Sequence, residues 1–407
     1  MPNVDVAYLD APSWDAEMRE RLRWLRENDP VHWSEPDQLW LVSKFEDVVS
    51  VSKDQGTYTS AEGVRPGNPA KLSLIDEGEP RHGELRALIN KGFTPRMVKK
   101  WETAFRKITT DSLDEIAKLG ECDFVDAISV PLPLLLIAEM IGIRKEDRER
   151  FHHWSDAMIA GDGNFHRPEI VAAAGQAFME YTTYCKDIIE ERRKNPQDDL
   201  LSILISAEDG GILGSIENKE DVPAIDNDRA ANELSMFCVL LLVAGNETTR
   251  NAISGGMELL IENPGEREKL LANPELLKSA VEEMVRLVSP VHSFARTATR
   301  TTELRGKTIE EGQKVLLLYP SANRDADEYE DPDVFRVDRN PHHVGFGIGP
   351  HFCLGANLAR MEMRVAFEQL LARLPDMEYA DDEGPVLKPS SLVRTCERMR
   401  VRYTPEA

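Results

Sequence analysis

The chain has 407 residues, a length typical of two or three domains of about 150 residues each, and a formal net charge of −23. A surface this acidic repels phosphate groups, which argues against nucleic acid or anionic lipid as partners. The most apolar run, residues 236–245, is too short for the ~20 residues of a membrane span, and the first residues lack a basic-then-apolar leader. We therefore expect a cytoplasmic protein with no membrane anchor.

Helical periodicity dominates the chain and strand-like stretches are few. Apolar residues recur at helical spacing over 14–28, 80–91, 97–117, 129–142, 168–193, 229–261, 274–287 and 354–372. Residues 31–34, 39–43, 296–304 and 314–319 have the composition of strands. These elements predict a mainly α fold with a minor β subdomain.

Residues 207–228 form a polar, glycine-bearing stretch between two helical segments. Taken alone, the stretch is typical of a linker, and Asp226 or Asp228 would cap the helix of a second domain. A surface loop within a single domain is the alternative.

The chain contains five cysteines and no C-x-x-C pair, which argues against a zinc ribbon or a dithiol redox site. Cys353 stands apart because it lies in the glycine-rich sequence FGIGPHFCLG, residues 346–355. Gly347 and Gly349 permit positive φ, and the helix that follows offers backbone N–H groups and a favourable dipole to a thiolate. Gly355 leaves a flat surface on which a large planar cofactor can lie.

The full pattern F-G-x-G-x-H-x-C-x-G resembles the haem-binding loop of the cytochrome P450 superfamily. The resemblance implies a P450 fold, with haem b between the long helix 229–261 and the helix 354–372. It implies that Cys353 is the iron ligand and that Phe346, Gly355 and Ala244 line the haem. It also implies one domain over residues 1–407, with 207–228 as a surface connection.

A second motif is EEMVR, residues 282–286, in which Glu283 and Arg286 share a helix face. Such a pair is common on protein surfaces and carries little information alone. Together with the later sequence DPDVFRVDRNP, it resembles the buried Glu-Arg-Arg cluster of the P450 superfamily, with Arg339 as the third member. The resemblance implies a structural role in holding the cysteine loop.

A third motif, LLVAGNETTR, lies in the long apolar helix. Gly245, Thr248 and Thr249 weaken a regular helix, so we expect a local widening there. The segment resembles the acid–alcohol pair of the family. The resemblance implies that Glu247 and Thr248 supply the protons needed for dioxygen activation.

A fourth motif, DEGEPRHGELR, places His82 and Arg86 four residues apart on one helix face. It resembles the start of a P450 helix whose side chains bind a haem propionate. The resemblance adds Arg296 and His351 as further partners of that carboxylate.

The resemblance implies a haem-thiolate monooxygenase that uses dioxygen. No flavin or iron–sulfur motif occurs in the chain. We therefore expect electrons from a separate ferredoxin and ferredoxin reductase, and we expect the reductase to take its electrons from NAD(P)H. Residues 81–107 carry eight Lys or Arg against two Glu, a local charge of +6 that is suited to an acidic ferredoxin.

Three stretches, 60–76, 120–125 and 131–143, are similar to actinobacterial enzymes that hydroxylate the cholesterol side chain. We therefore expect a bulky apolar substrate, a sterol or a related lipid. The expected pocket residues are Val243, Val291, Phe294 and Val393, with His292 as the polar member.

The alternatives are a fatty acid or terpene hydroxylase, an oxidative coupling enzyme, a dehydratase or isomerase, and a non-catalytic haem-binding protein. The intact Glu247–Thr248 pair disfavours the dehydratase and the isomerase.

Overall fold

The computed structural model describes residues 4–10, 14–68, 71–161, 164, 167–207 and 229–406. The helices are α1 Ala16–Asn28, α2 Phe45–Lys53, α3 Arg81–Ile89, α4 Pro95–Ile116, α5 Pro131–Ile141, α6 Arg148–Gly161, α7 Pro168–Lys194, α8 Leu200–Ala207, α9 Arg229–Leu240, α10 Asn246–Glu262, α11 Pro264–Ala272, α12 Leu277–Val288, α13 Tyr319–Ala322 and α14 Ala356–Arg373. Within these residues, no helix combines the length and the hydropathy required to cross a bilayer.

Local sequence signals explain where several of these helices begin and end. The side chain of Asp15 accepts a hydrogen bond from the backbone N–H of Met18 and caps α1. Thr94 caps α4 in the same way, and Pro95 occupies the first helical position, where its missing N–H costs nothing. Gly142 ends α5 with φ +81°, a conformation that favours glycine.

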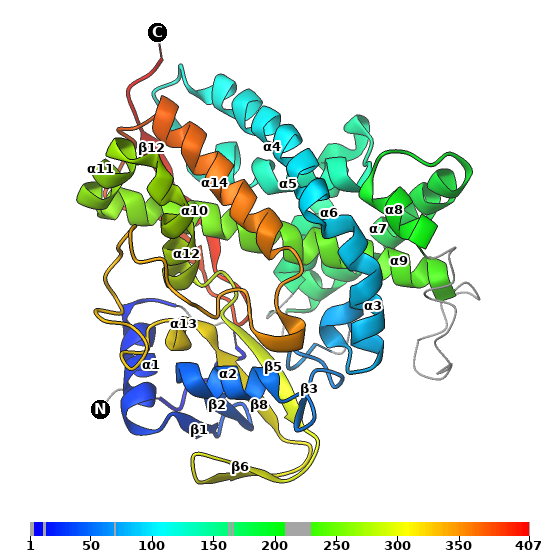
Figure 1. Cartoon of the computed structure of the whole chain (residues 1–407), viewed down its shortest axis with the longest axis vertical. Helices are drawn as coiled ribbons and strands as arrows, with labels where there is room; N and C mark the ends of the chain where they lie inside the picture. The colour runs from blue at the N-terminus through cyan, green and yellow to red at the C-terminus, as the bar shows by residue number, and fades with distance from the viewer. Residues whose placement is uncertain are drawn as a thin grey trace.

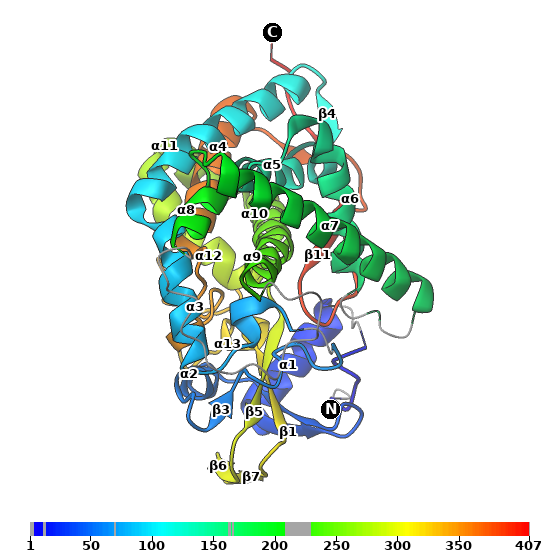
Figure 2. The same ribbon diagram turned by 90° about the vertical axis from the view of Figure 1, so that its right-hand side faces the viewer.

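The long central helix is not regular. A π-helical turn, Leu241–Gly245, joins α9 to α10, so the expected widening is present. Figure 2 views α9 and α10 nearly end-on, in the middle of the helical part of the molecule. Helices α5, α11, α12 and α14 pack against α10. The centre of the helical core is therefore the element that carries Glu247 and Thr248.

The main sheet has five strands in the order β1-β2-β8-β5-β3, with β2 and β8 parallel and the other pairs antiparallel. Figure 1 shows this sheet with α1 and α2 at one end of the molecule and most helices at the other. Its strands are β1 Val31–Ser34, β2 Leu39–Val42, β3 Tyr58–Thr59, β5 Ser293–Ala298 and β8 Lys314–Leu318. The short strands are β4 Glu121–Asp123, β6 Thr302–Leu304, β7 Lys307–Ile309, β9 Glu378–Tyr379, β10 Val386–Lys388, β11 Thr395–Arg398 and β12 Arg400–Arg402.

All eight predicted helices are present, with ends shifted by a few residues. Helices α2, α6, α8, α11 and α13 and most of the short strands were not predicted from the sequence. The expected 296–304 strand is two strands, β5 and β6, which lie in different sheets. Residues 208–228 lie outside the described residues, as do the proposed caps Asp226 and Asp228.

Candidate active site

The cysteine loop has the tight backbone that its glycines predict. Gly347 and Gly349 have φ of +67° and +77°. At Gly349 a Cβ would lie 2.8 Å from the carbonyl oxygen of Ser52, at the end of α2, so no side chain fits between the loop and that helix. The backbone N–H of Cys353 donates to the carbonyl oxygen of Phe346 at 2.8 Å and closes the loop.

Cys353 lies three residues before the first residue of α14, beside an open surface. A Cβ on Gly355 would meet no atom within 4 Å. Burial raises the pKa of the Cys353 thiol, whereas a hydrogen bond from the backbone of Gly355 and the charges of Arg86 and Arg360 lower it. The loop therefore presents a sulfur atom with nearby positive charge to a space that no side chain fills.

Four basic residues gather beside this space. His82 stacks on His351 with ring centroids 3.9 Å apart, and Arg86, Arg296 and His351 line the cavity between α10 and α14. Burial, followed by the charges of Arg296, His82 and Arg86, lowers the pKa of His351 to about 3. Within the part of the chain that the structure describes, the buried Nε2 atoms of both histidines and Nε of Arg296 have no hydrogen-bond partner. The cluster is thus rich in unsatisfied groups and in positive charge.

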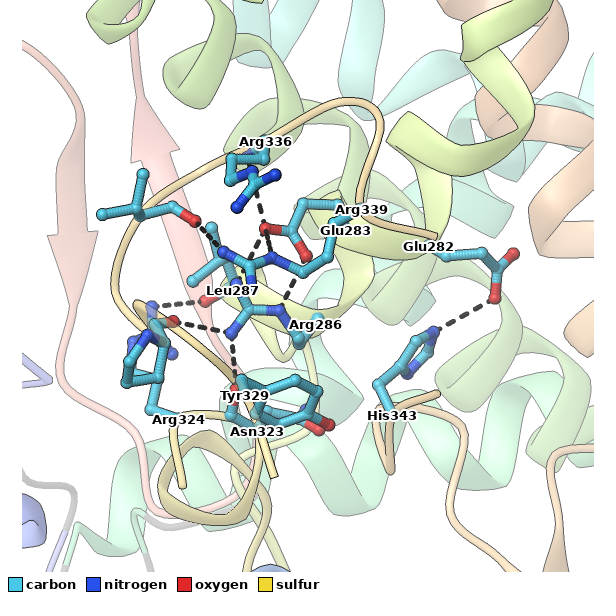
Figure 3. Close-up of polar contacts among 12 residues, drawn as sticks. Glu282, Glu283, Arg286, Leu287, Asn323, Arg324, Tyr329, Arg336, Arg339 and His343 are labelled. Atoms are coloured by element: carbon cyan, nitrogen blue, oxygen red, sulfur yellow. Dashed lines mark hydrogen bonds and ion pairs between the residues drawn. The ribbon is translucent and has the colours of Figure 1, made fainter. Parts of the chain in front are cut away.

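Glu283, Arg286 and Arg339 form the predicted cluster, which Figure 3 shows. Glu283 and Arg286 are fully buried, and the carboxylate accepts from Nε and Nη2 of Arg286 at 2.7 and 2.8 Å and from Nε of Arg339 at 3.0 Å. Arg286 also donates to the carbonyl oxygens of Asn323 and Pro332. These bonds tie α12 to the segment that leads into the cysteine loop.

A neighbouring contact that the sequence did not predict extends this link. Glu282 accepts from Nε and Nη2 of Arg360, on α14, at 2.6 and 2.7 Å, and lies 3.1 Å from Nε2 of His343. Burial acts against the charge of Glu282, but these two partners outweigh it and hold its pKa at about 2. The guanidinium of Arg360 lies over the ring of Phe346, 4.5 Å from its centroid.

A second cavity, of about 970 Å³, lies against the face of the central helix that carries Val243, Glu247 and Thr248. The four predicted apolar residues Val243, Val291, Phe294 and Val393 line it, together with Thr248. It meets the cavity of the cysteine loop, because both are lined by Ala244, Thr248, Val291 and Phe294. The cavity predicted for the substrate thus adjoins the cavity predicted for the haem along these shared residues.

Glu247 and Thr248 lie at the wall of this second cavity but have different hydrogen-bond partners. The hydroxyl of Thr248 donates to the carbonyl oxygen of Ala244 at 2.7 Å, in the π-helical turn. The carboxylate of Glu247 lies 2.6 Å from Nη2 of Arg250 and accepts from the side chain of Asn251 at 2.7 Å. Burial raises the pKa of Glu247, against the effect of both partners.

His292 does not lie where the sequence suggested. It is buried, lines neither of these two cavities, and stacks on Trp14 with centroids 4.0 Å apart. Burial, followed by the charge of Arg394, lowers its pKa to about 3. The backbone N–H of His292 donates to the carbonyl oxygen of Leu392 at 2.8 Å, and its ring packs on Trp14, so contacts with distant segments hold it outside the two cavities.

The basic stretch 81–107 is less charged than its composition indicates. Four of its cations form ion pairs with carboxylates from other turns or elements, namely Arg81 with Glu233, Lys100 with Asp198, Arg106 with Glu368 and Lys107 with Asp111. The described residues contain no ion-pair partner for the exposed side chains of Lys91, Arg96 and Lys99. The free positive charge is therefore confined to these three and to Arg86.

The family model described as cytochrome P450 matches residues 164–398. The chain is a cytochrome P450. The P450 fold and the monooxygenase class predicted from the cysteine loop are thereby confirmed.

Known P450 proteins resemble the chain along its whole length. A steroid C26-monooxygenase of Mycolicibacterium smegmatis is 36 % identical over 412 residues, which cover 100 % of this chain and 97 % of that protein. The structure of CYP109E1 from Bacillus megaterium in complex with testosterone superposes with a TM-score of 0.82 at 34 % identity, covering 95 % and 99 % of the two chains. P450BioI, in complex with an acyl carrier protein ligated to hexadec-9Z-enoic acid, gives 0.83 at 28 % identity, covering 95 % and 97 %.

The cofactor of this P450 is haem b, and the residues present fit it. The space above Gly355 admits a flat ring. The nitrogens of His82, Arg296 and His351 that have no partner among the described residues can donate to the carboxylates of such a ring. Such a carboxylate would also relieve the repulsion among these basic groups.

Sequence reasoning missed the partner of Glu247. Arg250 follows three residues later on the same helix face, a spacing that could have indicated the pair. The Glu282–His343 contact joins residues 61 positions apart, and no local pattern indicates it.

Proposed function

We propose that this P450 hydroxylates a steroid or a similarly bulky, uncharged lipid, with electrons from a separate ferredoxin and its NAD(P)H-linked reductase in the cytoplasm. The thiolate of Cys353 would hold the haem iron, and Phe346, Gly355 and Ala244 would lie beside the ring. The bound haem supplies the oxidising chemistry through its thiolate-ligated iron. The protein chain supplies ligation, protons and the orientation of the substrate.

His82, Arg86, Arg296 and His351 hold the haem through its propionates. Nε2 of His82, Nε2 of His351 and Nε of Arg296, which have no hydrogen-bond partner among the described residues, support this role, and Arg86 lines the same cavity. The Glu283, Arg286 and Arg339 cluster has no contact with the substrate in this proposal and holds the segment before the cysteine loop in place.

Thr248 and Glu247 deliver protons to the site. In the structure the carboxylate of Glu247 is held by Arg250, which also lies 3.2 Å from the carboxylate of Asp156. Asp156 is half exposed, so the ion-pair chain leads from the buried wall toward solvent. Release of Glu247 from Arg250 lets the carboxyl turn toward the hydroxyl of Thr248 and pass a proton inward.

The observation that carries the substrate assignment is the pairing of the arginine and lysine side chains around the cavity of about 970 Å³. A fatty acid needs a free cation for its carboxylate, but Arg65, Arg250, Lys388 and Arg398, which line this cavity, each pair with an acidic side chain. Apolar side chains lie beside Thr248 instead, where burial of hydrocarbon contributes about 25 cal/mol per Å². The names of the steroid-related relatives agree with this assignment.

Titration of the ferric holoenzyme with cholest-4-en-3-one, cholesterol, lauric acid and small terpenes tests the substrate class. We expect the two sterols to produce the low-spin to high-spin Soret shift at the lowest concentrations. A shift produced by lauric acid or terpenes but not by the sterols would refute the assignment and leave the monooxygenase class intact.

The ferredoxin docks near the exposed cations Lys91, Arg96 and Lys99. The exposed ring of Phe352, beside Cys353, offers an apolar contact close to the expected ligand. Nη2 of Arg86 donates to the carbonyl oxygen of Phe352 at 2.6 Å, which ties α3 to the cysteine loop. A positive rim around an apolar contact suits an acidic electron-transfer partner.

Electron-transfer rates with an acidic ferredoxin, measured from low to high salt, test the docking site. The Debye length falls from about 10 Å at 0.1 M to about 3 Å at 1 M, so the rate should fall with salt. The double variant Lys91→Glu with Lys99→Glu should lower the rate at low salt. Lys307→Glu, on β7 in the β part of the molecule, is the control and should leave it unchanged. Insensitivity to both salt and the double variant would exclude this surface.

A further inference from the structure

Glu362 is a buried carboxyl that the proposed reaction does not use. It lies on α14, is 3 % exposed, and lines the same cavity as Cys353. Its Oε2 has no hydrogen-bond partner among the described residues. A buried polar atom without a partner is unfavourable, so this side chain calls for an explanation other than packing.

Among the described residues no charged side chain pairs with Glu362, although Arg86, Arg296 and His351 line the same cavity. Helix α14 packs against α4, α10 and α12. The buried and half-buried charged side chains of these helices form ion pairs elsewhere: Lys100, Glu102 and Arg106 on α4, Glu247, Arg250 and Glu258 on α10, Glu282, Glu283 and Arg286 on α12, and Arg360, Arg364 and Arg373 on α14 itself. Burial alone raises the pKa of Glu362, to about 8.

An uncompensated carboxylate in this cavity would oppose the arrival of a second negative charge. Electrostatic interactions are strong where water is excluded, and the cavity that Glu362 lines is the one that fits the haem. An electron that enters the haem therefore favours the neutral form of Glu362, and ionised Glu362 disfavours reduction.

We propose that Glu362 is a redox-linked proton site, at which one proton binds when the haem is reduced under conditions that leave this carboxyl ionised in the oxidised enzyme. The step balances: one electron from an external donor reduces ferric to ferrous iron, and one proton from water forms the O–H bond of Glu362. No other bond forms or breaks, and the net charge of the cavity is unchanged.

The test is the haem midpoint potential of the full-length holoenzyme, measured spectroelectrochemically with dithionite and mediators from pH 6.5 to 9.5. In the wild type we expect a constant potential at the acid end, where Glu362 is neutral in both states, and a falling potential above about pH 8. Glu362→Gln should have a potential independent of pH over this range. Glu368→Gln, a more exposed glutamate on the same helix, is the matched control and should behave as the wild type.

A wild-type potential that does not change with pH, or a slope that persists in Glu362→Gln, would overturn the proposal. If Glu362→Gln does not incorporate haem, reduced-minus-oxidised infrared spectra of the wild type at pH 9 decide instead. We expect reduction to produce a protonated carboxyl band that shifts in D₂O, and its absence would overturn the proposal. Both readouts are independent of substrate turnover, so a failed sterol titration does not affect them.

Discussion

Replacing Glu283 by glutamine should destabilise the protein more than a change at any exposed acidic residue of the same region. The fully buried carboxylate accepts three bonds from the guanidinium groups of Arg286 and Arg339 at 2.7–3.0 Å, and the backbone N–H of Arg336 donates to it at 3.3 Å. Glutamine keeps one acceptor oxygen but directs N–H donors at buried cations. Removing one partner of a buried ion pair costs about 3–5 kcal/mol, so we expect a loss in that range.

The assay is guanidinium unfolding followed by circular dichroism, with haem retention followed by the Soret band. Glu275→Gln is the control, because Glu275 is highly exposed and pairs with Lys278 on the surface, and it should change stability by less than about 1 kcal/mol. Glu283→Asp, which retains the charge on a shorter side chain, should lie between the two. A loss below about 1 kcal/mol in Glu283→Gln would show that the cluster does not hold the cysteine loop.

The remaining predictions concern the ligand, the proton supply and the buried carboxyl. Reduced wild type with carbon monoxide should show the red-shifted Soret band of thiolate ligation, and Cys353→His should lose it; a variant that kept the band would exclude Cys353 as the ligand. Thr248→Ala should still bind haem and substrate but lower the product formed per NAD(P)H and release hydrogen peroxide, with a rate loss of at most about 10²–10⁴-fold; an unchanged yield would contradict the proton-delivery role. Burial raises the pKa of Glu362 from 4.5 to about 8, so between these pH values the group is ionised in the unfolded chain and neutral in the folded protein. The free energy of unfolding of the wild type should therefore fall as pH rises from 4.5 to about 8. In urea unfolding from pH 5 to 9, Glu362→Gln should therefore gain stability relative to the wild type as pH rises, by up to about 5 kcal/mol, and a difference that is constant with pH would contradict the assignment.

Local sequence signals predicted the parts of the site that depend on backbone geometry. The glycines of the 346–355 loop indicated positive φ, and the structure has it at Gly347 and Gly349. Gly245 with Thr248 and Thr249 indicated an irregular helix, and a π-helical turn occupies Leu241–Gly245. In each case the conformational preference of a few adjacent residues is sufficient to set the geometry.

Features that depend on contacts between distant segments were not predictable in this way. The free positive charge of 81–107 is smaller than its composition indicates, because carboxylates as far away as Glu233 and Glu368 pair with its cations. His292 was assigned to the pocket because its sequence neighbours are apolar, but its ring packs on Trp14, which lies far away along the chain. Glu362 sits among apolar residues on one face of its helix, but only the packing of α14 shows that it has no charged partner.

The close approach at Gly349 gives the β part of the molecule an influence on the metal site. The backbone of the cysteine loop at Gly349 contacts the last turn of α2 directly. Because no side chain lies between them that could change its conformation, a displacement of α2 should move the loop as well. Substitutions in the core beneath α2, such as at Val48 or Val51, therefore lie far along the chain from Cys353 yet should alter the absorption spectrum of the cofactor. Helix α2 and the core beneath it thus support the ligand loop mechanically, and the absorption spectrum of the protein should report on their integrity.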